Sequence, residues 1–90
     1  MASLIRVKDA KRGNLLFFST PPQVRGRHHM TIKVSADEGM SWPRKWHTLI
    51  DERFSAYSCL TTVDEDKIGL LYEGPSELYF VRIPIKDLIP

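Results

Sequence analysis

The segment 35–42 holds the densest set of side chains whose types and spacing carry chemical meaning, Ser-Ala-Asp-Glu-Gly-Met-Ser-Trp. A carboxylate such as that of Asp37 can accept backbone N–H groups inside a turn. Gly39 allows a positive φ where a side chain would clash, and Trp42 offers a large ring that anchors the turn by burial. This spacing is the Asp-box pattern, which builds architecture rather than a reaction centre. Its defining positions are Ser35, Asp37, Gly39, Ser41 and Trp42.

Other reactive side chains have simpler structural interpretations. His28 and His29 are adjacent, and neighbouring residues of a strand point to opposite faces, so we assign them no metal site. Cys59 is the single cysteine, which excludes an internal disulfide bond and a cysteine zinc cage. Its apolar neighbours predict a buried position. The acidic run 64–66 predicts a solvated hairpin turn, and we expect neither a metal nor a cofactor.

The elements that must position these residues follow from the alternation of apolar and polar side chains, because period-2 patterns dominate and long helical periods are absent. Turn-forming residues separate the strands. The order gives four strands and then three, with a connection over 51–55 between the groups. The expected strands cover 2–7, 15–19, 30–34, 46–50, 57–63, 68–73 and 78–83, and one helical turn follows over 85–89.

Short strands at regular spacing predict an all-β, antiparallel protein, which could be a sandwich, a barrel or the blades of a propeller. Four-stranded groups of about 40–50 residues favour blades. The first group fills that length, and the Asp-box segment falls between its third and fourth strands, where such a box marks a hairpin in a propeller blade. The second group is one strand short.

Composition limits the class of protein further. The 90 residues allow one small domain at most, and 42% hydrophobic residues suffice for a packed core. The formal net charge is +2 and the basic residues are scattered, which argues against a nucleic-acid binder. No apolar run reaches the ~18–20 residues that span a bilayer. Arg6 and Lys8 interrupt the apolar start, so we expect no signal peptide.

In their joint order, these segments resemble the bacterial exo-α-sialidases (neuraminidases), a glycoside hydrolase family of six-bladed β-propellers. The resemblance covers nearly the whole chain. Segment 2–5 is similar to the inner strand of the fifth blade, and Met1 to an internal position of the family. The other segments that carry the resemblance are 16–21 (L-x-F-S-x-P), 26–33 (the third arginine of a triad), 35–42 (the Asp box), 56–60 (the catalytic tyrosine) and 68–73 (G-x-L-Y-E).

The resemblance implies roles for individual residues. Tyr57 would be the nucleophile, and Glu73 would buttress a triad arginine outside this chain. Arg27 would bind the carboxylate of sialic acid, with Arg25 as the alternative if the loop register differs. A neutral phenol avoids the repulsion that a carboxylate nucleophile would meet at an anomeric carbon bearing a carboxylate. Arginine suits that carboxylate because its planar fork donates two parallel hydrogen bonds. Without the resemblance, Tyr57, Arg27 and Glu73 are interpreted as a half-buried strand tyrosine, a solvated loop arginine and a strand-end acid.

The resemblance also implies an incomplete catalytic domain. Residues 1–52 would form a complete blade with the Asp box, and 53–90 three strands of the final blade plus a short C-terminal turn. The acid/base aspartate, the glutamate that activates the tyrosine and the other two triad arginines would precede this region. We therefore expect the 90-residue chain alone to lack activity and to self-associate through faces that the remaining blades would cover.

The partners that follow are sialylated glycans and the remaining blades of the parent propeller, without nucleic acid or a membrane span. By family resemblance, the parent would be secreted or periplasmic. The alternative function is a non-enzymatic Asp-box β module that binds carbohydrate or a protein partner. A third interpretation is a truncation product without activity.

Overall fold

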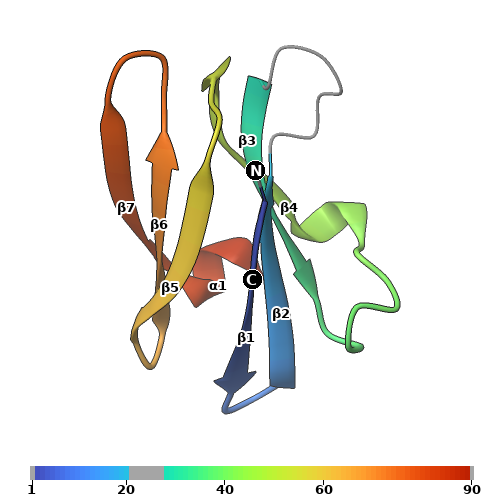
Figure 1. The fold of residues 1–90 in the computed structure, drawn as a ribbon. Coiled ribbons are helices and arrows are strands. Elements are labelled where there is room, and N and C mark those ends of the chain that lie inside the picture. Colours follow the sequence, from blue (N-terminus) through green and yellow to red (C-terminus); the bar gives the residue numbers. More distant parts are fainter. Residues whose placement is uncertain (1, 21–27, 90) are drawn as a thin grey trace.

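The computed structural model describes residues 2–20 and 28–89. This part of the chain forms two antiparallel sheets, four strands in the order β1-β2-β3-β4 (sheet A) and three in the order β5-β6-β7 (sheet B) (Figure 1). Each predicted strand overlaps an observed one, and the all-β, antiparallel class is confirmed. The elements are β1 (Ser3–Asp9), β2 (Gly13–Thr20), β3 (His28–Ser35), the 3-10 turn η1 (Arg44–Trp46), β4 (His47–Phe54), β5 (Ser58–Asp64), β6 (Lys67–Glu73), β7 (Leu78–Pro84) and α1 (Ile85–Leu88).

Strand β4 is longer than the sequence predicts. A strand over 46–50 and a connection over 51–55 were expected, whereas β4 runs His47–Phe54. The polar run 51–53 resembles a loop, but β3 pairs with β4 as far as His28. Backbone pairing with β3 therefore extends β4 over residues whose side chains alone would predict a turn.

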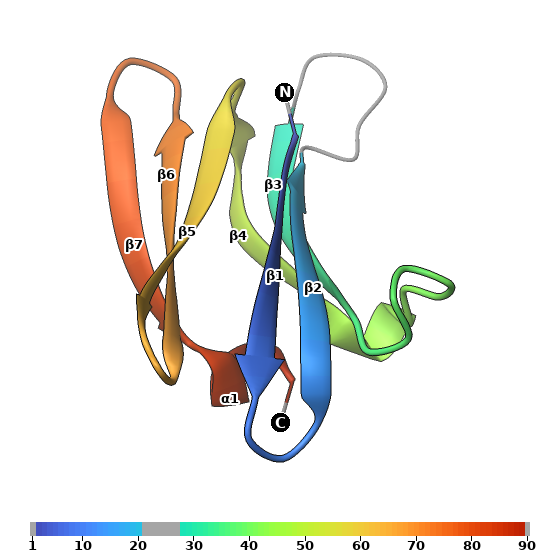
Figure 2. The ribbon, with the colours of Figure 1, turned by 60° about the horizontal axis from the view of Figure 1, so that its bottom comes forward.

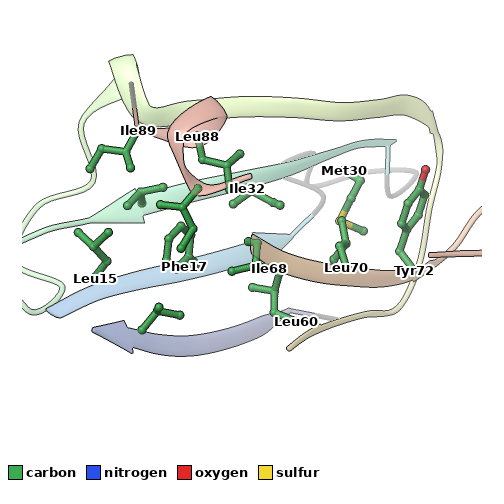
Figure 3. Close-up of a cluster of buried hydrophobic side chains, with 13 residues drawn as sticks. Leu15, Phe17, Met30, Ile32, Leu60, Ile68, Leu70, Tyr72, Leu88 and Ile89 are labelled. Atoms are coloured by element: carbon green, nitrogen blue, oxygen red, sulfur yellow. The ribbon is translucent and has the colours of Figure 1, made fainter. Parts of the chain in front are cut away.

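The inner faces of the two sheets pack against each other and form one core (Figure 3). Leu15, Phe17 and Ile32 of sheet A are fully buried, as are Ile68 and Leu70 of sheet B. Each such side chain contributes about 1.5–3 kcal/mol when it leaves water. The core therefore depends on both sheets, because neither sheet alone covers its apolar face.

The short helix α1 closes one end of this core. The Ile85 N–H donates to the Asp66 carbonyl at 2.8 Å, which ties α1 to the hairpin between β5 and β6. Leu88 and Ile89 are each 1% exposed, and Figure 3 shows them at the end of the core opposite to Tyr72. In Figure 2, α1 lies next to the hairpin end of sheet B and beside the lower parts of β1 and β2. No helix in the described part of the chain is long and apolar enough to cross a membrane.

The outer face of sheet B exposes apolar side chains. Leu78, Phe80 and Leu71 are 70%, 50% and 43% exposed. The prediction that Cys59 is buried is wrong, because the thiol side chain is exposed. Its neighbour Leu60, only 4% exposed, takes the inward position, and strand alternation sends Cys59 outward. Sheet B thus presents an apolar surface on the side away from sheet A.

Candidate functional site

Tyr57 lies in the connection between the two sheets, directly before β5. Ser55 and Ala56 anchor this connection at 0% and 3% exposure, whereas Tyr57 is 55% exposed. The Ala56 N–H donates to the Glu73 carbonyl at 3.0 Å, and the Glu73 N–H donates to the Tyr57 carbonyl at 2.9 Å. These hydrogen bonds fix the backbone of Tyr57 while its side chain stays accessible.

Tyr57 and Glu73 line one groove of about 210 Å³. The start of β5 and the end of β6 lie at the end of sheet B opposite α1 (Figure 1). The exposed side chain of Leu78 forms part of its wall. The structure therefore brings together two of the residues that the sequence singles out. Arg27 and the alternative Arg25 lie outside the described residues.

The turn 35–42 is organised around Asp37. Its carboxylate accepts the Ser41 N–H at 2.8 Å, the Ser41 hydroxyl at 2.6 Å and the Ser35 hydroxyl at 2.8 Å. These bonds, first of all the one from the Ser41 hydroxyl, hold the pKa of Asp37 below its ordinary value. The Gly39 N–H donates to Ser35 Oγ at 2.9 Å, and Gly39 has a φ of +87°. L side chains rarely adopt that conformation, so this position requires glycine.

Side-chain contacts hold this turn against sheet A. The half-buried Trp42 ring lies with its centroid 5.9 Å from that of Phe18 on β2. Arg6 on β1 forms an ion pair with Glu38 in the turn. None of these residues lines the groove of Tyr57, and their contacts join the turn to sheet A.

A polar cluster between the two sheets was not anticipated from the sequence; we call Asp51, Arg53, Tyr72 and Tyr79 the cross-sheet cluster. The Asp51 side chain is 8% exposed and accepts the Tyr72 hydroxyl at 2.9 Å. Arg53 donates to the same carboxylate through Nε at 2.9 Å and Nη2 at 2.7 Å. The Arg53 guanidinium lies 5.1 Å from the centroid of the Tyr79 ring, which stacks on Tyr72 at 5.5 Å. The cluster thus joins β4 of sheet A to β6 and β7 of sheet B.

The cluster changes the proton affinity of its members. Hydrogen bonds from Arg53 hold the pKa of Asp51 well below its ordinary range, although burial acts in the opposite direction. Burial, and then the hydrogen bond to Asp51, raise the pKa of Tyr72. At neutral pH, Asp51 is therefore ionised and Tyr72 is protonated, which makes their contact a charge-assisted hydrogen bond.

A second polar contact joins the sheets beside Tyr57. The hydroxyl oxygens of Ser58 on β5 and Ser19 on β2 lie 2.8 Å apart, and Ser19 is fully buried. The Leu60 N–H donates to Ser3 Oγ on β1 at 2.9 Å. The strand that follows Tyr57 is thus hydrogen-bonded to sheet A as well as packed against it.

The register of β4 explains why strand alternation does not reveal the cross-sheet cluster. Thr31 lies opposite Leu49 but Met30 lies opposite Asp51, so β4 contains an extra residue here. Because Met30 faces the core, Asp51 faces the core too, whereas strict alternation from Leu49 would point it outward. The sequence feature that could have indicated the cluster is the i, i+2 spacing of Asp51 and Arg53, which places both side chains on one face of a strand.

The fold and the site define an all-β protein in which two packed antiparallel sheets present an accessible tyrosine and a glutamate in one groove. Within residues 2–20 and 28–89, no group of three or more His, Cys, Asp or Glu side chains is arranged to hold a metal ion. No protein-family model matches the chain.

The chain is 43% identical, over 99% of its length, to a sialidase of Bacteroides fragilis (strain YCH46), and it spans 17% of that protein. It is 35% identical, over 80% of its length, to a sialidase of Micromonospora viridifaciens, of which it spans 12%. The chain therefore belongs to the sialidase family, which confirms the resemblance seen in the sequence, and it corresponds to a small part of the length of these relatives.

Proposed function

We propose that the chain is part of an exo-α-sialidase that hydrolyses terminal sialic acids of glycoconjugates with retention, and that Tyr57 is the nucleophile. The observation that carries this proposal is the position of Tyr57, which is 55% exposed in a groove shared with Glu73. Its backbone is fixed by hydrogen bonds to Glu73. The matches to two sialidases support the substrate class.

In the proposed reaction, the Tyr57 phenol oxygen forms a bond to the anomeric carbon of sialic acid as the bond from that carbon to the leaving oxygen breaks. A base outside this chain takes the phenol proton, and an acid outside it protonates the leaving oxygen. Water then attacks the same carbon, gives up a proton to the former acid, and releases the tyrosine, which regains its own proton. Two inversions at one carbon leave its configuration unchanged.

Two further residues take supporting roles in the proposal. Arg27 holds the substrate carboxylate through its planar fork. Glu73 buttresses a triad arginine in another part of the longer protein. Glu73 lies beside Tyr57 in the groove, which supports this role, because a second triad arginine would have to approach the substrate carboxylate there.

We also propose an architecture for the longer protein. Residues 1–52 form one complete propeller blade, and 53–90 form three strands of the last blade plus a short C-terminal turn; the last two residues of β4 lie past this boundary. Turn 35–42 is the Asp box of the complete blade. The hydrogen bonds to Asp37 and the positive φ of Gly39 support this assignment. The remaining blades cover the apolar outer face of sheet B around Phe80, which does not line the groove of Tyr57.

The isolated 90-residue chain is inactive under this proposal, because the acid, the base and two triad arginines lie elsewhere. The first test is therefore made on the longer protein that contains the segment, with a fluorogenic α-sialoside as substrate. The wild-type protein should hydrolyse it, and Tyr57→Phe should lower kcat by about 10²-fold or more, because phenylalanine has no nucleophilic oxygen.

The stereochemistry gives a second readout of the same experiment. Proton NMR of the first-formed sugar should show the α-anomer, as expected for retention. Near-normal hydrolysis by Tyr57→Phe would refute the nucleophile. Glycan binding by the wild-type protein without any hydrolysis would instead favour a non-enzymatic β module.

A further inference from the structure

We propose that the two sets of hydrogen bonds between the sheets, Tyr72 to Asp51 and Ser58 to Ser19, position Tyr57 for reaction. The inference rests on the proposed function of Tyr57. Tyr72 is in this account a positioning residue, because it acts through Tyr57 and not on the substrate. An exposed phenol needs such support, since its own ring is not fixed by burial and its place depends on the backbone that carries it.

The first link runs through β6. Tyr72 is 5% exposed, and its hydroxyl donates to Asp51 of sheet A at 2.9 Å. The next residue, Glu73, exchanges backbone hydrogen bonds of 3.0 and 2.9 Å with Ala56 and Tyr57. A displacement of Tyr72 relative to sheet A therefore moves the backbone of Tyr57 with it.

The acceptor of this link is itself held in place. Two donors of Arg53 reach the Asp51 carboxylate at 2.9 and 2.7 Å. Arg53 is on the same strand two residues away, so the group that orients the carboxylate comes from the strand that carries it. Figure 3 shows Tyr72 at the end of the core opposite to Leu88 and Ile89, which is the end where β5 begins.

The second link runs through β5. Ser58 follows Tyr57 directly, and its hydroxyl oxygen lies 2.8 Å from that of the fully buried Ser19. Tyr57 is thus tied to sheet A on its C-terminal side through Ser58 and across the β5–β6 pairing through Tyr72. Ser58 and Tyr72 are paired across β5 and β6, so the two hydrogen bonds hold the backbone beside Tyr57 to sheet A at two adjacent points.

The test uses Tyr72→Phe in the longer protein, with a fluorogenic α-sialoside as substrate. We expect kcat to fall by about tenfold to a hundredfold with KM within about twofold, because small misplacements of a reacting group cost rate rather than affinity. Tyr79→Phe is the matched control, since it removes a hydroxyl from the stacked neighbouring ring that contacts Arg53 at 3.5 Å. Its kcat should stay within about twofold of the wild type.

A double-mutant cycle separates positioning from a general loss of structure. With all variants folded by circular dichroism, Tyr72→Phe should have no further effect on the residual rate of Tyr57→Phe. An equal fall in both backgrounds would overturn the inference, because a structural defect does not depend on the nucleophile. Should Tyr72→Phe fail to fold, Ser58→Ala tests the second link in the same cycle.

The outcomes also distinguish this inference from the proposed function. Unchanged kcat in Tyr72→Phe and Ser58→Ala, together with an inactive Tyr57→Phe, would overturn the positioning role and leave the nucleophile in place. A fully active Tyr57→Phe would overturn the proposed function itself.

Discussion

Replacing Asp51 with alanine removes the acceptor that holds the cross-sheet cluster together. The change leaves the buried Tyr72 hydroxyl without the carboxylate that accepts it at 2.9 Å. The Arg53 side chain is 52% exposed and can be hydrated instead, so the loss of its ion pair contributes little to the change in the free energy of unfolding. A lost hydrogen bond to a charged group is worth about 1.5–3 kcal/mol, and we expect Asp51→Ala to lower the free energy of unfolding by about that amount.

The measurement is urea unfolding of the 90-residue chain, followed by tryptophan fluorescence. Protein concentration is held fixed, because association shifts apparent stability. Glu52→Ala is the matched control, since it removes an exposed carboxylate from the adjacent position of β4. Its effect should stay within about 0.5 kcal/mol.

The dependence on pH provides an independent check of the same role. Folding lowers the pKa of Asp51, so its stabilising contribution is present above the pKa of an unfolded aspartate, about 3.9. It is lost as the pH falls below that value toward the lowered pKa of the folded state. The stability difference between wild type and Asp51→Ala should therefore be constant above about pH 5 and shrink below about pH 4. A difference under about 0.5 kcal/mol at neutral pH, or one unchanged at about pH 3, would refute the reasoning.

Further predictions concern the turn and the outer face of sheet B. Gly39→Ala should destabilise the chain by about 1–2 kcal/mol in urea unfolding, because its φ of +87° disfavours a Cβ. Met40→Ala, at an 85% exposed side chain of the same turn, is the control. Equal stability of both variants would contradict the expected backbone strain of an alanine at position 39. The isolated chain should self-associate in light scattering, and Phe80→Lys should shift it toward the monomer by charging the apolar face of sheet B. A monodisperse wild-type monomer would argue against this.

Strand alternation predicted the fold because both sheets bury their inner faces in one core, and sheet B leaves its outer face exposed. The predictions that failed relied on the types of neighbouring residues rather than on strand pairing and alternation. β4 continues through the polar run 51–53 because β3 pairs with it there. Cys59 is exposed because Leu60 occupies the inward position next to it. Local sequence contains neither fact, since both depend on what lies beside the strand.

The candidate site was predictable only in part. The closeness of Tyr57 and Glu73 follows from the β5–β6 hairpin, whose register pairs Ser58 with Tyr72. The contact between Asp51 and Tyr72 could not be derived in this way, because it joins two sheets whose relative placement depends on the whole core. A bulge in β4 also reverses the side to which Asp51 points. The roles of Arg27 and Arg25 stay predictions.

The meander order of both sheets bears on how the chain acquires its structure. Within the described residues, every strand pairs only with its neighbours in the chain, so β1 to β4 can pair with one another without β5. Sheet B can form by the same local pairing, whereas every contact between the layers needs both sheets. The hydrogen bonds that hold the tyrosine strand to sheet A therefore depend on residues from both halves of the chain.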